Sequence, residues 1–371
     1  MEIVKEKQVV VKDTRKEIKN RESNFEILRI LAMMMIIFHH LSVHSGFEYS
    51  MTVISLNKLW IQFIQMGGKI GVNIFVLISG YFLINSDKIK TSKVLKLWGQ
   101  MVFTSLIIYI VFVLVGLREF EIKPFLKTLI PVINETWWFA SAYFLLYIIS
   151  PFLNIILKNI DRNTYKKMIC FMVVCWCIIP TFIDKNFQFN SFIWFIVLYC
   201  IAGYIKLYSE NWKISNKRYF ILAGILIIVT YLIVIFLDKM NLIISSKNSN
   251  SNYFFAMQRL PIFLISLFLF LGFMKTKIKY SKTINKLATT TFGIYLIHDN
   301  SYMRSFLWKD FFKVKNFEES TILIPYSIFV CCIVFVSCAA IDLIRSNTIE
   351  KYYMNIVYRI ETKINNKNRK D

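Results

Sequence analysis

The first long apolar stretch of the chain, NFEILRILAMMMIIFHHLSVHSG at residues 24–46, carries three histidines and one arginine. Ionisable groups are costly inside hydrocarbon, so in a membrane helix they generally mark binding or proton transfer. Arg29 and His40 would share one face of an α-helix, about 16 Å apart along its axis. His44 would stay near that face, whereas His39 would point about 100° away. The pattern predicts a permanent cation and a titratable base on one helical stripe, unless Arg29 merely reaches lipid phosphates.

The remaining histidine, His298, lies in a second apolar stretch, TTTFGIYLIHDN, beside Asp299. A helix that begins near Lys286 would carry His298 to a depth of about 18 Å, close to that of the first three histidines. This agreement in depth predicts a polar cavity shared by two helices that are far apart in the sequence. The alternative is two unrelated groups of histidines at the membrane interface.

The composition is that of a membrane protein. Of the 371 residues, 56% are hydrophobic, 16% are aromatic and only 18% are charged, and the mean hydropathy is +0.51. The net charge of +22 would suit nucleic-acid binding, but the basic residues lie between apolar blocks, so we expect no nucleic-acid partner. The seven cysteines lie in apolar blocks without zinc-site spacing, so we expect no metal site.

Apolar blocks long enough to approach the roughly 20 residues of a membrane-crossing helix recur along the whole chain. The fifth and ninth are short, so we expect one of them to be tilted, broken or re-entrant. The sequence therefore predicts an all-α, polytopic integral membrane protein with about ten transmembrane helices. The blocks are 25–44, 67–85, 97–116, 137–157, 168–183, 190–208, 219–237, 256–274, 287–303 and 321–344.

Lys and Arg are more than twice as numerous in one set of alternate segments as in the other. Because basic loops remain on the cytoplasmic side, both termini are predicted to be cytoplasmic. The predicted organisation is a basic tail (1–24), a membrane domain (25–344) and a second basic tail (345–371). The basic segments are 1–24, 86–96, 158–167, 206–218, 275–286 and 345–371.

Four blocks resemble, in order, the motifs of the acyltransferase-3 family of bacterial integral-membrane O-acyltransferases. The first block is similar to the family helix in which an arginine precedes a histidine, here Arg29 and His40. The resemblance extends over about residues 22–345, nearly the whole chain. The other three resemble the Phe-x-x-Ser-Gly, Trp-Phe…Tyr…Pro and Gly-Ile-Tyr-Leu-x-His helices: GVNIFVLISGYFL (71–83), WWFASAYFLLYIISPFLN (137–154) and TFGIYLIHDN (291–300).

The resemblance implies transfer of an acyl group, usually acetyl, from cytoplasmic acyl-CoA to a hydroxyl of a cell-envelope carbohydrate. It implies that His40 and His298 are catalytic, and it leaves open which one is the base and whether a histidine carries the acyl group. Lys93 and Lys96 stand where family members often have Arg-x-x-Arg. With Arg29 they would bind the phosphates of acyl-CoA as a co-substrate, and no permanently bound cofactor is expected.

Further polar and aromatic side chains of these blocks are candidates for the acceptor site. They are His39, His44, Ser79, Trp138 and Tyr143. The expected partners are the lipid bilayer, acyl-CoA, an envelope glycan or glycolipid, and proteins of glycan synthesis, in the plasma membrane of a bacterial cell. The alternative is a transporter that exports a surface polysaccharide or lipid-linked glycan, because buried Arg and His also mark transport. No convincing inverted repeat supports that alternative.

Overall fold

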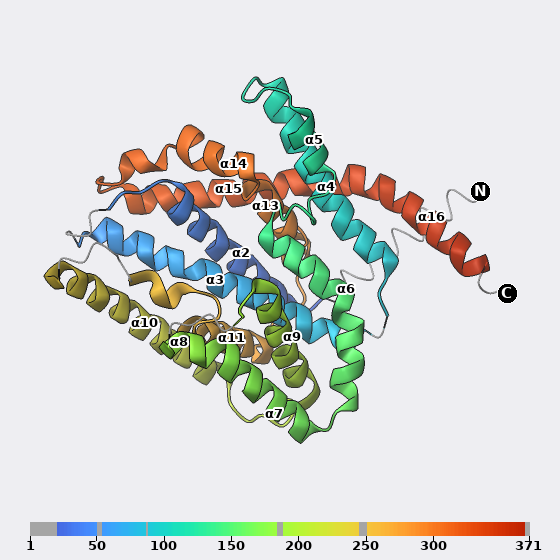
Figure 1. The fold of residues 1–371 in the computed structure, drawn as a ribbon, viewed down its shortest axis with the longest axis horizontal. Helices are drawn as coiled ribbons and strands as arrows, with labels where there is room; N and C mark the ends of the chain where they lie inside the picture. The colour runs from blue at the N-terminus through green and yellow to red at the C-terminus, as the bar shows by residue number, and fades with distance from the viewer. Residues whose placement is uncertain (1–20, 50–53, 87, 184–187, 245–250, 368–371) are drawn as a thin grey trace.

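The computed structural model describes residues 21–49, 54–86, 88–183, 188–244 and 251–367. Every regular element in these ranges is a helix (Figure 1), as predicted. Most of the predicted N-terminal tail, residues 1–20, lies outside the described residues.

The described residues contain eight helices that are long and apolar enough to cross a membrane. They confirm an all-α polytopic membrane protein. The eight are α2 (Ser23–His44), α3 (Leu56–Leu83), α4 (Thr91–Leu114), α6 (Trp138–Asn159), the run from α7 (Arg162–Val173) to α8 (Ile179–Ile183), α9 (Ser191–Tyr208), α10 (Asn216–Ile244) and α15 (Leu323–Arg345). The shorter helices are α5 (Ile122–Thr128), α11 (Leu260–Lys275), α12 (Lys282–Ala288), α13 (Thr291–His298), α14 (Ser301–Ser305) and α16 (Lys351–Lys367).

Helices α2 and α3 lie side by side in the middle of the molecule, with α15 along one side and α9 and α11 along the other (Figure 1). Glycines on α3 permit the close approach to α2. A Cβ atom at Gly71 would lie 2.6 Å from the carbonyl oxygen of Ala32, and one at Gly68 would overlap the ring of His39. Small residues at these two positions therefore allow the two helices to pack closely.

The ninth apolar block, 287–303, is divided among three short helices instead of forming a single one. Helix α13 has eight residues and ends at His298, and α14 begins two residues after Asp299. The side chain of Asn300 caps α14 by accepting a hydrogen bond from the backbone N–H of Tyr302 at 3.0 Å. The expectation that one of the two short blocks is broken is therefore confirmed here, and the break determines where His298 lies.

The predicted start of the second apolar block is wrong. Helix α3 begins at Leu56, eleven residues before the predicted start, because the Ser55 hydroxyl caps it by accepting from the N–H of Lys58 at 3.1 Å. Lys69, the third residue of the predicted block 67–85, therefore lies in the middle of this helix. The predicted basic tail at 345–371 contains the helix α16, which packs against α4.

Candidate functional site

A histidine pair lies at the junction of α2 and α13. His40 is buried on α2, and His298 is fully buried at the last residue of α13. Nδ1 of His40 lies 2.9 Å from Nε2 of His298. On the other side of its ring, Nδ1 of His298 lies 2.6 Å from the carbonyl oxygen of Ile294. The two rings thus form a chain that ends on the backbone.

The chain of contacts determines which ring nitrogens carry hydrogen when both imidazoles are neutral. A carbonyl oxygen only accepts, so Nδ1 of His298 must carry its hydrogen and Nε2 of His298 must be an acceptor. Nδ1 of His40 must then donate to His298. The remaining nitrogen, Nε2 of His40, therefore keeps an unprotonated lone pair.

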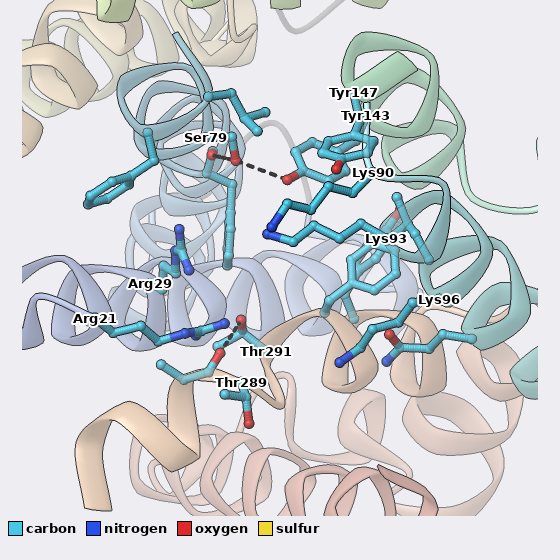
Figure 2. Close-up of a pocket in the computed structure, with 18 of the residues that line it drawn as sticks. Arg21, Arg29, Ser79, Lys90, Lys93, Lys96, Tyr143, Tyr147, Thr289 and Thr291 are labelled. Carbon is cyan, nitrogen blue, oxygen red and sulfur yellow. Dashed lines mark hydrogen bonds between the residues drawn. The ribbon is translucent and has the colours of Figure 1, made fainter. Parts of the chain in front are cut away.

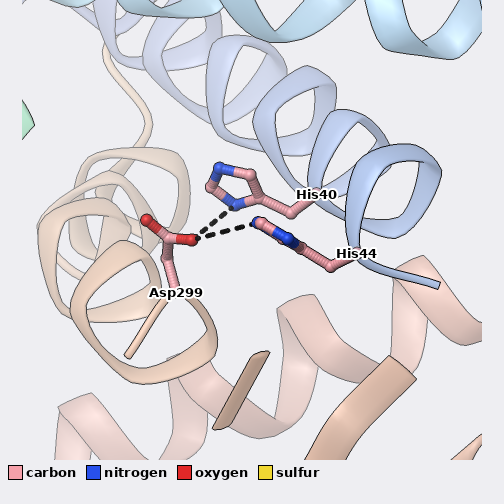
Figure 3. Close-up of side chains that lie close together, drawn as sticks. All are labelled: His40, His44 and Asp299. Carbon is pink, nitrogen blue, oxygen red and sulfur yellow. Dashed lines mark ion pairs between the residues drawn. The ribbon is translucent and has the colours of Figure 1, made fainter. Parts of the chain in front are cut away.

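Asp299 adds a carboxylate beside this pair. Its Oδ1 lies 3.5 Å from Nδ1 of His40 and 3.8 Å from Nε2 of His44 (Figure 3). Arg304 holds the same carboxylate in a two-pronged contact, with Nε at 2.7 Å from Oδ1 and Nη2 at 2.9 Å from Oδ2. The spacing of the two histidines and Asp299 would suit a metal ion, but both carboxylate oxygens already accept from a guanidinium and His40 already donates to His298. This set of contacts favours hydrogen bonding over metal coordination.

Three of the four histidines line a cavity of about 220 Å³, which we call the histidine cavity. His298 lies directly behind His40. His39 also lines this cavity, although it was expected to point about 100° away from His40. Its Nδ1 lies 2.7 Å from the carbonyl oxygen of Gln65, and this contact holds the ring against α3. Its ring lies against Gly68 of α3. The lining comprises Met33, Ile36, His39, His40, Val43, His44, Gly68, Lys69, Val72, Trp138, Phe139, Tyr295, Asp299 and Arg304.

A second, larger cavity of about 410 Å³ lies beside the first half of α2 and the start of α4. We call it the basic vestibule, because five of its lining side chains are cations: Arg21, Arg29, Lys90, Lys93 and Lys96 (Figure 2). No carboxylate lines this cavity among the described residues. Its positive charge makes it suited to a polyanionic ligand.

Acidic residues lie just outside this lining and hold some of the cations in place. Glu26 lies 3.2 Å from Arg21 and 3.3 Å from Arg29, and Glu350 lies 2.8 Å from Nζ of Lys96. The three residues expected to bind acyl-CoA all line the basic vestibule: Arg29 from α2, and Lys93 and Lys96 from α4.

Two residues expected at the acceptor site lie in the basic vestibule instead of the histidine cavity. The hydroxyl groups of Ser79 and Tyr143 lie 3.2 Å apart there, and Ser79 also donates to the carbonyl oxygen of Phe75 at 2.8 Å. Trp138, by contrast, lies with the histidines. The structure thus separates the expected acceptor residues into two groups.

Three side chains, Met33, Phe139 and Tyr295, line both cavities. The rings of Phe139 and Tyr295 meet edge to face with their centroids 5.4 Å apart. We call these three side chains the septum. They are the only residues common to the two linings among the described residues, so they separate the basic vestibule from the histidine cavity.

Sequence reasoning missed several residues of both cavities. In the histidine cavity these are Lys69, Tyr295 and the Asp299–Arg304 pair; in the basic vestibule they include Arg21, Lys90 and Tyr147. The sequence did contain a signal for Lys69. This lysine lies in the glycine-rich run GGKIG of an apolar block, and a cation in a closely packed membrane helix indicates a binding site. Nothing in the sequence pointed to Arg304. Its side chain reaches Asp299 because the chain turns between the end of α13 and the start of α14.

The family profile of an acyltransferase domain matches residues 22–343. The match includes the histidine pair, Asp299, Arg304, the septum and most of the basic vestibule. Comparisons with curated proteins and with solved structures gave no match.

Proposed function

Because this chain belongs to the acyltransferase-3 family, we propose that it transfers an acyl group, typically acetyl, from acyl-CoA to a hydroxyl of a cell-envelope carbohydrate. The observation that carries this proposal is the pair of adjoining cavities, one lined by cations and the other by histidines, with the septum lining both. Two substrates of different chemistry would then meet where the cavities adjoin.

The basic vestibule suits the anionic end of acyl-CoA. Coenzyme A carries several phosphate charges, and Arg and Lys side chains bind phosphate oxygens through charge-assisted hydrogen bonds. Arg29 and Lys93 are contributed by segments at the end of the bundle that the distribution of basic residues predicts to be cytoplasmic, where acyl-CoA is available. Lys96 keeps the charge expected at this position, without the forked geometry of arginine.

The histidine cavity supplies the groups needed at the reacting atoms. On this proposal the thin pantetheine arm passes the septum, and Met33, Phe139 and Tyr295 turn aside to admit the thioester. Arg29 and His40 lie in opposite halves of α2, about 16 Å apart along the helix axis, so a long flexible arm is required to connect the two cavities.

In the reaction, Nε2 of His40 acts as the general base. It takes the proton of the acceptor hydroxyl as that oxygen attacks the thioester carbonyl carbon. When the tetrahedral intermediate collapses, the C–S bond breaks, and the CoA sulfur leaves and takes the proton back from His40. The products are the O-acyl carbohydrate and free CoA. If the imidazole instead attacks the thioester first and forms an acyl-histidine, the same nitrogen is used.

His298 and Asp299 assist through contacts with His40. His298 accepts from Nδ1 of His40, which keeps the Nε2 lone pair available and fixes the orientation of the ring. When His40 becomes positively charged, the Asp299 carboxylate 3.5 Å from its Nδ1 stabilises that charge. We therefore assign His40 as the catalytic base and His298 as a positioning residue.

The function is tested by reconstituting the protein in liposomes with acetyl-CoA labelled in its acetyl group and glycolipids extracted from bacterial membranes. The expected result is label on carbohydrate that mild base releases as acetate, as an ester requires, and no such label in protein-free liposomes. Mass spectrometry of surface glycans from cells with and without the protein provides the second readout. Loss of the whole glycan from the surface, with an unchanged number of esters per chain, would contradict acyl transfer and support export.

A further inference from the structure

The histidine cavity has an excess of positive charge. Lys69 and Arg304 contribute two cations to its lining, whereas Asp299 contributes the one carboxylate among the described lining residues. Arg304 holds both oxygens of Asp299, so these two charges compensate each other. The ammonium group of Lys69 forms no ion pair with any carboxylate of the described residues. It lies instead 4.6 Å from the ring centroid of Trp138.

An ammonium group in this position is unfavourable without a counter-ion. Lys69 lies in the middle of α3 between closely packed helices, and it is partly buried. The contact with Trp138 compensates for only part of the lost hydration, because a cation–π contact is weaker than a paired negative charge. Two nearby glycines, Gly68 and Gly71, keep the helices close around it. The ammonium group of Lys69 is therefore placed to bind a negatively charged group of a ligand in the histidine cavity.

We propose that the carbohydrate acceptor is anionic and that its phosphate or carboxylate group pairs with Lys69. The inference rests on the proposed acyl-transfer function, because it concerns the second substrate of the same site. The volume of about 220 Å³ restricts the occupant to a small unit such as one sugar ring with its substituent. Lys69 and Trp138 bind the charged end of this unit, and its hydroxyl is directed to His40.

The charge of the acceptor is tested first on the natural product. Membranes containing the protein are incubated with labelled acetyl-CoA, and the glycan that carries base-labile label is applied to an anion-exchange column. We expect the labelled glycan to be retained, and phosphorus NMR of the retained fraction distinguishes a phosphate from a carboxylate. Label in the neutral, unretained fraction would overturn the inference while leaving acyl transfer intact. The absence of any protein-dependent ester would overturn the proposed function, and the inference with it.

The role of Lys69 is tested with the same glycan after mild base has removed its esters and regenerated the acceptor. For Lys69→Met, which keeps the aliphatic stem beside Trp138, we expect the KM for this acceptor to rise about ten-fold or more, the usual effect of losing a hydrogen-bonded charge contact. The kcat and the KM for acetyl-CoA should change little, which also shows that the variant is folded. Lys69→Arg should restore most of the affinity.

A matched control is Lys206→Met. Lys206 also lies over an aromatic ring, with Nζ 4.4 Å from the ring centroid of Tyr81, but it lines neither the histidine cavity nor the basic vestibule. Its kinetic constants should equal those of the unmodified protein. A fall in kcat for Lys69→Met at unchanged acceptor KM would overturn the inference, because Lys69 would then act on the reacting carbonyl instead of on the acceptor.

Discussion

Nδ1 of His40 donates to Nε2 of His298 across 2.9 Å, although 258 residues separate the two in the chain. The contact exists because α13 ends at His298 and presents this last residue to the middle of the bundle, where α2 carries His40. A second contact, from Nδ1 of His298 to the carbonyl oxygen of Ile294, fixes the direction of donation. The lone pair on Nε2 of His40 is therefore a consequence of how α13 ends.

Replacement of His298 should separate its role as acceptor from its bulk. In His298→Gln the side-chain oxygen can still accept from Nδ1 of His40, so we expect kcat to fall only about ten-fold. In His298→Phe no acceptor remains and the His40 ring loses its orientation, so the loss should be about 100-fold or more. Steady-state acetylation at saturating acetyl-CoA is the measurement.

The pH profile of these variants provides the control for His298. If His298 only positions His40, the base itself is still present in His298→Gln. The dependence of kcat on pH should therefore still show one ionisation, at a shifted pH. Equal losses of activity in the Gln and Phe variants would show that the hydrogen bond to His40 has no part in the reaction.

Arg29 should affect acyl-CoA and leave the acceptor unaffected. Its guanidinium lies in the basic vestibule, 3.3 Å from Glu26, and Glu26 also pairs with Arg21 at 3.2 Å. Arg29→Met therefore leaves Glu26 with a partner, and the fold should persist. We expect the KM for acetyl-CoA to rise about ten-fold through the loss of a phosphate contact, with kcat nearly unchanged.

Arg162→Met is the control for Arg29, because Arg162 stacks on Tyr208 at 5.3 Å outside both cavities. Its KM for acetyl-CoA should not change. If Arg29→Met instead lowered kcat at an unchanged KM, the basic vestibule would not be the site that binds the donor's phosphates.

Gly68 should tolerate no side chain. The added methyl group of Gly68→Ala would overlap the ring of His39, which contacts the Gln65 carbonyl, and would force α2 and α3 apart. Overpacking of this kind costs about 1–3 kcal/mol, so the Tm in detergent should fall and acetylation should decrease. Gly224→Ala is the matched control, because nothing lies within 4 Å of a Cβ atom there and alanine favours a helix. A Tm for Gly68→Ala equal to that of Gly224→Ala would contradict the close packing of α2 on α3.

Most of the features that the sequence predicted depend on one helix alone. The composition and the length of the apolar blocks indicated an all-α membrane protein, and helical periodicity placed Arg29 and His40 on one stripe of α2. The two residues now line the basic vestibule and the histidine cavity, respectively. The depth of His298 was also predicted by counting residues from Lys286. This estimate of depth remains roughly correct even though the helix is interrupted.

Apart from the polar region shared by His40 and His298, features that depend on contacts between helices could not be predicted. Asp299 was noticed only as the neighbour of His298, and its pairing with Arg304 requires the chain to turn between α13 and α14. Lys69 was predicted to lie at the very start of an apolar block, because the predicted start at residue 67 comes eleven residues after the actual start of α3. Both errors concern charged groups inside the membrane domain, where tertiary contacts override the local pattern.

The most direct test of the account is acetyl transfer by His40→Gln in proteoliposomes, measured as base-labile label on the glycan in a single turnover. Glutamine can still hydrogen bond to His298 but offers no basic lone pair, so the rate should fall by a factor of about 100 to 10,000. The affinity for acetyl-CoA, measured separately, should be unchanged, because the basic vestibule is intact. An undiminished rate of ester formation by His40→Gln would contradict the assignment of His40 as the base.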